Sequence, residues 1–250
     1  MLVGLAVSQV ALLTTTVYLH RALSHRALAL GPGAVTVARV IIWTTTGIKP
    51  RQWVAVHRKH HAFTDVPGDP HSPRLLGFWR VQLTNALLYR KVARDPATVA
   101  RYARDLPADR LDRILFDRSF VGLGLEVAVL CALVGWQAGL VAAGVQVTSY
   151  LALNAAVNAI GHSRGRQSYP NTAFNNRWLA WVTAGEGLHN NHHAAPTSAR
   201  LSLARGEHDI GWYAISVLVR LKQASIRLSE PHIRGARPAP LAAQRAGSPR

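Results

Sequence analysis

The sequence has 250 residues, 49% of them hydrophobic, and its formal net charge at pH 7 is +17. A soluble globule rarely combines these two properties, whereas an integral membrane protein with basic flanks on one side does. Nucleic-acid binding is the other common reason for such a charge. It is disfavoured because all 29 Lys and Arg residues lie outside the two longest apolar regions, 1–19 and 119–160. The single cysteine, Cys131, excludes an intrachain disulfide and a cysteine-based zinc or iron–sulfur site.

Residues 1–19 are apolar and predict a membrane helix, about long enough to span a bilayer. A signal peptide is the alternative, but the segment has no basic n-region and no clear cleavage site. His20 and His25 follow at once. Their spacing of five places the two rings about 140° apart on an ideal helix. Both can reach one metal ion only if the helix ends or bends between them, so we expect them where the helix leaves the membrane.

Residues 34–48 are apolar, but they are short for a span and include Arg39. If they crossed the bilayer, the first histidine pair and the next histidine cluster would lie on opposite sides. We therefore predict an interfacial or re-entrant segment. Residues 51–61 should form a helix that carries the next cluster, and residues 74–118 should form a solvated, basic cap.

Residues 119–135 and 138–160 predict two further membrane helices. The turn between them carries no basic residue, so the positive-inside rule places it outside and the histidines on the cytoplasmic side. Glu126 is costly in lipid, and we expect it to face the interior of the helix bundle. In the second helix Asn154, Asn158 and His162 are four residues apart and share one face. We place Asn158 in the site, one turn before His162.

The densest cluster is GEGLHNNHH over residues 185–193, at the end of a helix predicted for residues 178–193. On a helix His189 and His193 share a face, with His192 beside them. Imidazoles this close disfavour protonation, so they are suited to bind metal. Residues 210–221 predict an amphipathic interfacial helix, and residues 229–250 a disordered basic tail after one domain over residues 1–228.

Nine histidines lie in or beside these clusters, more than one tetrahedral zinc needs. They suit two ions of higher coordination, and imidazole binds iron, copper and zinc alike. Ions at a membrane face suit O₂ chemistry on a lipid-soluble substrate. The nine are His20, His25, His57, His60, His61, His162, His189, His192 and His193.

The order of these motifs resembles the membrane fatty-acid desaturases, specifically the acyl-CoA delta-9 (stearoyl-CoA desaturase-like) family. The matching motifs are HRALSH at 20–25, HRKHH at 57–61, DPH at 69–71, NAIGH at 158–162 and GEGLHNNHH at 185–193. The resemblance covers roughly residues 1–222. It implies an all-α integral membrane protein, in which a cytosolic helical cap over four membrane helices carries a histidine-rich di-iron site.

The resemblance further implies two Fe²⁺ ions bound by the nine histidines, with Asn158 contacting one ion through water. Asp69 and His71 match a family motif, and we expect them around the ligands or near the substrate head group. The implied reaction uses O₂ and two electrons to make a cis double bond in a saturated fatty acyl chain. In the family another membrane helix precedes the one that leads into the first motif. This sequence begins at the second, which leaves three crossings.

The expected partners are membrane lipid and a fatty acyl thioester, acyl-CoA above all. The sequence has no nucleotide fingerprint, cysteine cluster or fused haem domain, so we expect a separate ferredoxin- or cytochrome-type electron donor with its reductase. A di-iron hydroxylase or ketolase is the nearest alternative, since it would use the same motifs. A non-catalytic membrane metal-binding or transport protein is the other, but it would need a polar path through the apolar segments.

Overall fold

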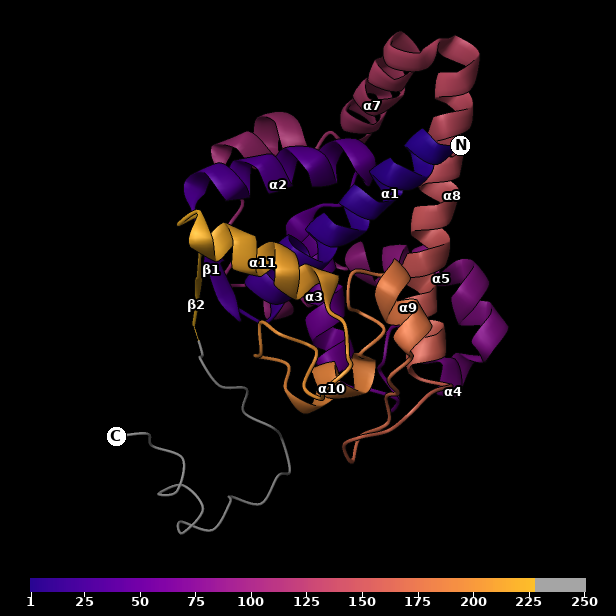
Figure 1. Ribbon diagram of the computed structural model, residues 1–250, viewed down its shortest axis with the longest axis vertical. Helices are drawn as coiled ribbons and strands as arrows, with labels where there is room; N and C mark the ends of the chain where they lie inside the picture. The colour runs from indigo at the N-terminus through magenta and orange to yellow at the C-terminus, as the bar shows by residue number, and fades with distance from the viewer. Residues whose placement is uncertain (228–250) are drawn as a thin grey trace.

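The computed structural model describes residues 1–227, so the predicted tail over 229–250 lies outside the described residues. Helices dominate the described chain (Figure 1). In chain order the elements are α1 (Leu2–Thr14), the π-helix η1 (Thr15–Ser24), β1 (Leu28–Leu30), α2 (Pro32–Thr45), α3 (Pro50–Ala62), α4 (Pro73–Leu76), α5 (Phe78–Ala93), α6 (Pro96–Tyr102), the π-helix η2 (Asp112–Phe116), α7 (Ser119–Val134), α8 (Trp136–Gly161), α9 (Arg177–Val182), α10 (His189–Ala194), α11 (Ile210–Arg220) and β2 (Ala224–Ile226).

Within residues 1–227 two continuous helices are long and apolar enough to cross a membrane: α1 together with η1, and α8. The apolar helix α7 has 16 residues and runs antiparallel to α8 (Figure 1). The two meet at Gly135, whose φ of 84° is a conformation that glycine adopts without strain. The helix α1 packs closely on α8, because a Cβ at Gly4 would lie 2.2 Å from the carbonyl oxygen of Ala142. The predicted helices at 1–19, 119–135 and 138–160 are therefore all present as helices.

The segment predicted to be interfacial or re-entrant forms α2, which begins with Pro32 in its first turn. In the view of Figure 1, α2 runs across the direction of α8. It packs against α7, where the missing side chain of Gly122 leaves room for Trp43. The helix ends before Gly47, whose φ of 61° turns the chain toward α3.

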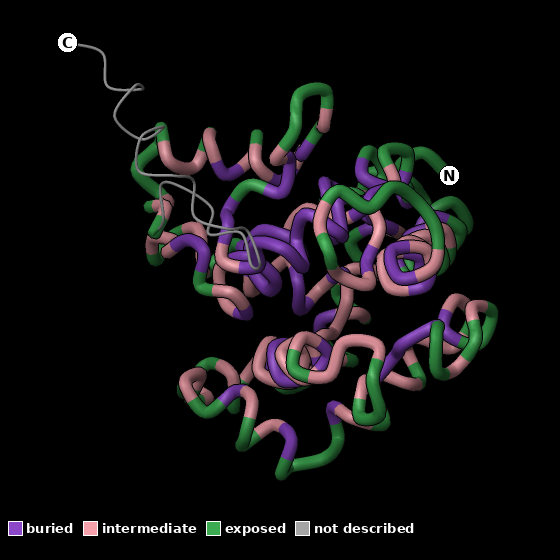
Figure 2. The backbone as a smooth tube through the Cα atoms, turned by 90° about the horizontal axis from the view of Figure 1, so that it is seen from below, coloured by how far each residue is buried: buried purple, intermediate pink, exposed green. Residues whose placement is uncertain are grey.

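The interior of the molecule gathers η1, α3 and α10. Figure 2 shows buried stretches of the chain, in purple, running through the middle of the molecule, with exposed stretches, in green, on its outer helices and loops. All six residues of α10 are buried, and so are eight of the ten residues of η1. The expectation of a purely helical chain is wrong in one detail, because β1 and β2 pair as a short antiparallel ladder that joins Leu28 to Ile226. Strands of three residues give no periodic signal in the sequence.

The helices predicted for residues 51–61 and 210–221 are confirmed as α3 and α11. The single helix predicted for residues 178–193 is wrong, since α9 ends at Val182 and α10 starts only at His189. Between them Ala184 and Gly185 have φ angles of 52° and 102°. A Cβ at Gly187 would lie 2.2 Å from the backbone nitrogen of Ala180. The two glycines of the GEG motif thus fold the chain back onto α9.

Candidate metal centre

The structure brings all nine predicted histidines together in two adjoining groups. Within each group the nitrogens that could serve as ligands lie within 4.8 Å of one another. The first group holds His20, His25, His57, His61 and His192, and the second holds His60, His162, His189 and His193.

Helical spacing explains how each HxxHH motif contributes to both groups. In α3, His57 and His61 are one turn apart and point into the first group, while His60 points into the second. In α10, His189 and His193 are one turn apart and belong to the second group. The intervening His192 belongs to the first, so α3 and α10 each serve both groups.

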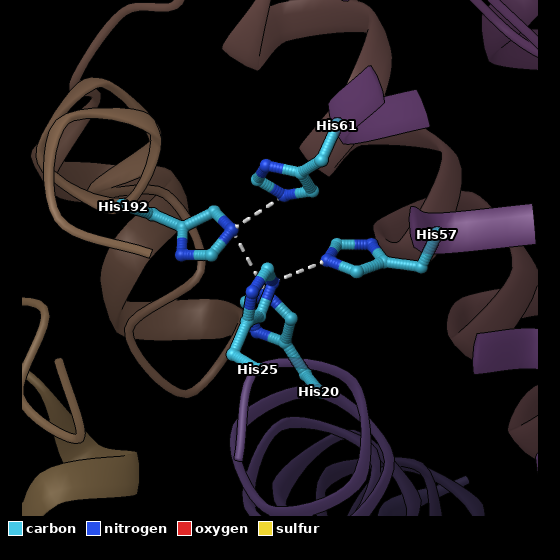
Figure 3. A group of neighbouring side chains, drawn as sticks. All are labelled: His20, His25, His57, His61 and His192. Atoms are coloured by element: carbon cyan, nitrogen blue, oxygen red, sulfur yellow. Dashed lines mark hydrogen bonds between the residues drawn. The ribbon is translucent and has the colours of Figure 1, made fainter. Parts of the chain in front are cut away.

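Figure 3 shows the ring nitrogens of the first group converging from η1, α3 and α10. Nε2 of His25 lies 2.7 Å from Nε2 of His57. Nε2 of His192 lies 3.0 Å from that of His20 and 2.9 Å from that of His61. Trp53 stacks on the ring of His57 at 4.9 Å and covers one side of the group.

The π-helix η1 brings His20 and His25 close together although they are five residues apart. A π-helix closes its backbone ring five residues along, so positions i and i+5 lie nearly above one another. The backbone N–H of His25 donates to the carbonyl of His20 at 3.1 Å in this pattern. The helix also ends at Ser24. The two ring centroids are 4.9 Å apart as a result.

In the second group Nε2 of His189 lies 3.0 Å from Nε2 of His162 and 3.3 Å from that of His193. His162 directly follows α8. A Cβ at Gly161 would lie 2.9 Å from the ring of His189, so the glycine lets the two elements approach. Nε2 of His60 is buried and has no hydrogen-bond partner within the described residues.

Three carboxylates, two of them with buried side chains and that of Glu186 partly buried, hold the opposite ring nitrogen of three of these histidines. His20 Nδ1 lies 2.7 Å from Oε1 of Glu186. His60 and His162 make the same contact with Asp69, at 3.0 Å, and with Asp65, at 2.9 Å. With Nδ1–H donating to a carboxylate, the lone pair of Nε2 is turned toward the group, as metal-bound histidines require.

Asp65 and Glu186 were not among the residues singled out in the sequence. They could have been found, because the chain has only 12 acidic residues and these two lie within four residues of a histidine motif. Burial raises the pKa of Asp65, but hydrogen bonds from His162, Ser72 and Thr172 outweigh it and hold the pKa well below its usual range. Asp65 therefore stays ionised.

Burial and neighbouring imidazoles lower the pKa of the histidines at the heart of the two groups. Desolvation is the main cause for His57, His61, His189, His192 and His193, and the nearby rings add to it. These rings are therefore neutral at physiological pH, the form that binds metal.

The spacing of the Nε2 atoms fits metal binding. Neutral rings that point lone pairs at one another repel unless a cation lies at their common focus. Two nitrogens bound at right angles to one ion, each about 2.1 Å from it, would be about 3.0 Å apart. The contacts between paired Nε2 atoms, from 2.7 to 3.3 Å, agree with that value. The all-imidazole donor set suits iron, copper or zinc.

The remaining predicted site residues lie beside the second group. The backbone N–H of His71 donates to Oδ1 of Asp69 at 3.0 Å, and its ring centroid lies 4.8 Å from that of His60. Burial, followed by the proximity of His60, lowers the pKa of His71 to about 3. His60, Asp69 and His71 form a third set of groups close enough to hold a metal. Asn158 lines a cavity that reaches His189.

This cavity has a volume of about 520 Å³ and runs from the histidines toward the apolar helices. At one end it is lined by His20, His57, His71, Asn158 and His189. Away from the histidines the wall is formed by the segment after α2, by α5, by the start of α7 and by α8, through residues such as Ile48, Ala86, Phe120, Leu123, Val147 and Leu151. Apolar walls next to metal-binding groups suit a hydrocarbon substrate.

Fold and site together define a helical protein with membrane-length apolar helices and adjoining histidine groups able to bind metal. The family model described as fatty acid desaturase matches residues 1–215. The chain belongs to the fatty acid desaturase family.

Curated relatives include the acyl-CoA 5-desaturase AL21 of Anemone leveillei, 33% identical over 84% of this chain and 66% of its own length. The sn-1 stearoyl-lipid 9-desaturase of Synechocystis sp. is 32% identical over 81% of this chain and 63% of its own. The delta-9 acyl-lipid desaturase 2 of Arabidopsis thaliana is 34% identical over 80% of this chain and 65% of its own. The chain thus spans slightly under two thirds of the length of these relatives.

Proposed function

We propose that this protein is a di-iron fatty acyl desaturase that introduces a cis double bond into a saturated acyl chain. The observation that carries the proposal is the position of the two histidine groups, because His20, His57 and His189 line a cavity that continues between apolar helices. Family membership and the names of the relatives support it. The proposed desaturase domain comprises residues 1–228.

The two ions would be Fe²⁺, one in the five-histidine group and one in the four-histidine group with Asn158 beside it. When bound, they would supply the activation of O₂ and the removal of two hydrogens from neighbouring methylene groups. Glu186, Asp69 and Asp65 would hold three of the rings in the tautomer that binds metal. His71 would complete the buried wall beside His60.

The chain's own contribution to the reaction is to position the substrate and exclude water. The acyl chain would lie in the cavity, whose apolar wall includes Val147 and Leu151 of α8 and Ala86 of α5. Trp53 covers His57 and also lines the cavity, so it separates the first group from bulk water. A dry site strengthens the electrostatic interactions within it and protects the reactive centre from side reactions.

We propose a multi-pass membrane protein, in which α1 with η1, α7 and α8 cross the bilayer and α2 lies at the interface or re-enters. Gly135 between α7 and α8 would lie outside. The remaining helices would form a cytoplasmic cap that carries the site, since the basic residues lie outside the apolar spans.

The proposed substrate is a saturated fatty acyl chain on an anionic carrier, acyl-CoA in the first place, desaturated at the delta-9 position. The delta-9 relatives and the acyl-CoA 5-desaturase support the chemistry, although their names differ in carrier and position. Lys49, Arg90 and Arg94 line the cavity, and their charges suit the phosphates of CoA.

The two electrons would come from a separate ferredoxin- or cytochrome-type protein with its reductase. A surface hollow is lined by Arg26, Arg58, Arg104 and Asp105. Arg26 and Arg58 directly follow His25 and His57, whose rings belong to the first group. This basic surface would attract an acidic donor.

The test is the fatty-acid profile of a host that expresses the chain with a ferredoxin and its reductase, beside a His193→Ala control. Mass spectrometry would locate any new double bond. We expect a cis-monoenoic acid that disappears in the control. A hydroxy acid would replace the proposal by the hydroxylase alternative. An unchanged profile, in cells whose purified protein holds two irons, would contradict it.

A further inference from the structure

The wall that α5 contributes to the cavity carries two polar groups that have no partner among residues 1–227. Asn85 and Tyr89 are four residues apart, so they lie on one face of α5, and both line the cavity. The hydroxyl of Tyr89 and Oδ1 of Asn85 are buried and make no hydrogen bond within the described residues. Leaving such groups unpaired is costly in a folded protein, which makes an unpaired pair on a cavity wall a sign of a ligand.

The other tyrosine on this cavity wall behaves differently. The hydroxyl of Tyr150 in α8 lies 3.0 Å from Oγ1 of Thr15, so those two side chains satisfy one another. In the described part of the chain no side chain or backbone group pairs with the Tyr89 hydroxyl in this way, although Tyr89 lines the same cavity. Burial raises the pKa of Tyr89, so its phenol stays protonated and remains a hydrogen-bond donor at any physiological pH.

The chemistry of the proposed substrate limits what these groups can bind. This step rests on the proposed function. A saturated acyl chain has no hydrogen-bond acceptor along its methylene groups, and its one strong acceptor within the apolar part is the carbonyl oxygen of the ester or thioester. That oxygen has two lone pairs. The Tyr89 hydroxyl can donate to one, and Asn85 can donate to the other through Nδ2, in the orientation of its amide that turns this nitrogen rather than Oδ1 toward the carbonyl.

We propose that Asn85 and Tyr89 form a binding site for the acyl carbonyl of the substrate. A carbonyl fixed on α5 would set how far the chain reaches toward the histidine groups. It would therefore determine which pair of methylene groups lies at the metals. The double bond would therefore form at a fixed distance from the carboxyl end, whatever the total length of the acyl chain.

The test compares two probe ligands on purified wild-type and Tyr89→Phe protein. Methyl stearate carries the carbonyl, whereas methyl octadecyl ether has the same length without it. Affinities would come from competition against a brominated stearate ester that quenches tryptophan fluorescence, since Trp53 lines the same cavity. Tyr213→Phe is the matched control, because it removes the same hydroxyl from an exposed residue of α11. Iron content would be measured for every variant.

We expect wild type and Tyr213→Phe to bind the ester about 2- to 10-fold more tightly than the ether, the range of one neutral hydrogen bond. Tyr89→Phe should bind both probes alike with unchanged iron content, and its product should carry double bonds at several positions. If Tyr89→Phe still discriminates as wild type does, the carbonyl site is wrong. If wild type binds neither probe, both the carbonyl site and the proposed function are overturned.

Discussion

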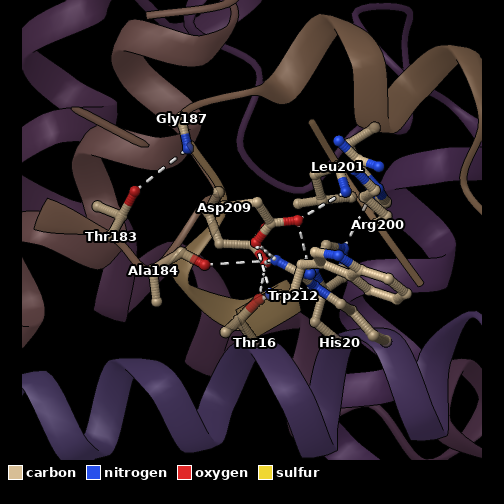
Figure 4. A network of polar contacts seen from close by, with 12 residues as sticks. Thr16, His20, Thr183, Ala184, Gly187, Arg200, Leu201, Asp209 and Trp212 are labelled. Carbon is tan, nitrogen blue, oxygen red and sulfur yellow. Dashed lines mark hydrogen bonds and ion pairs between the residues drawn. The ribbon is translucent and has the colours of Figure 1, made fainter. Parts of the chain in front are cut away.

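Arg21 and Asp209 form a buried, two-pronged ion pair that joins η1 to the start of α11. Nη1 and Nη2 of Arg21 lie 2.9 and 2.8 Å from the two carboxylate oxygens, and both side chains are at most 1% exposed. Arg21 also donates to the carbonyl oxygens of Ala184 and Ala199. Figure 4 shows the polar contacts around Asp209, with Ala184, Leu201 and Trp212 beside it. One cation thus holds together three segments that support the first histidine group.

We predict that Asp209→Asn lowers the free energy of unfolding by about 3–5 kcal/mol, because it removes the nearer of the two carboxylates paired with the buried charge of Arg21 and leaves only Glu186, at 3.9 Å. Asp209 also accepts the backbone N–H of Trp212 and caps α11, which Asn can still do. Denaturant unfolding in detergent would measure the change. The paired variant Arg21→Met with Asp209→Leu should recover part of the loss, since no charge is left unpaired. Equal stability of Asp209→Asn and wild type would contradict this role.

Glu186 should matter through His20. The variant Glu186→Gln removes the carboxylate that holds His20 Nδ1 and that Thr16 also contacts. We expect iron affinity to fall by about 10- to 100-fold, the usual effect of losing such a partner. Titration against a chelator would measure it. Asp95→Asn, at the exposed cap of α6, is the control and should leave affinity unchanged. A loss of the same size in both variants would contradict a specific role of Glu186.

The metal-free protein should be sensitive to acid. Burial lowers the pKa of His57, His61 and His189 below the unfolded value of about 6.5. Below that pH the unfolded chain takes up more protons than the folded one, so stability falls as pH falls. Each such histidine lowers the free energy of unfolding by up to about 1.4 kcal/mol for every pH unit below that value. We would measure the unfolding midpoint of the metal-free protein from pH 8 to pH 5. It should decrease once the pH falls below about 6.5. A flat profile would show that the rings are not buried in the neutral form.

The turn before α10 should depend on glycine. A Cβ at Gly187 would meet the backbone of α9 at 2.2 Å, so Gly187→Ala should cost at least about 2 kcal/mol and displace the histidines that follow. Gly144→Ala is the matched control on α8, where nothing lies within 4 Å of the new Cβ. We expect it to be neutral or stabilising by up to about 1 kcal/mol. Thermal unfolding of the two variants would measure the difference. Equal stability of the two would contradict this role of Gly187.

Much of the site could be predicted from sequence, because histidine motifs are rare and their spacings are specific. The convergence of four separate segments, three with a histidine cluster and one with His162, followed from the number of histidines that had to be used. The division of each HxxHH motif between two groups did not follow, because it depends on how α3 and α10 face one another.

The failures of prediction have local causes. The helix predicted for residues 178–193 is broken because Gly185 and Gly187 sit in a tight turn, and helical periodicity cannot reveal such a turn. The expectation that the helix ends or bends between His20 and His25 is confirmed, since it ends at Ser24, but its π-helical form is too rare to predict from composition. Proximity to a histidine motif in the sequence marks Asp65 and Glu186 as candidates, but only the fold shows that their partners are His162 and His20.

The central claim is that two metal ions occupy two separate histidine groups. The most direct measurement is the iron content per chain of purified protein, compared between wild type, His25→Ala and His162→Ala. We predict two irons in wild type and one in each variant, because His25 belongs only to the first group and His162 only to the second. The account would be contradicted if both variants kept the iron content of wild type, or if wild type held a single iron.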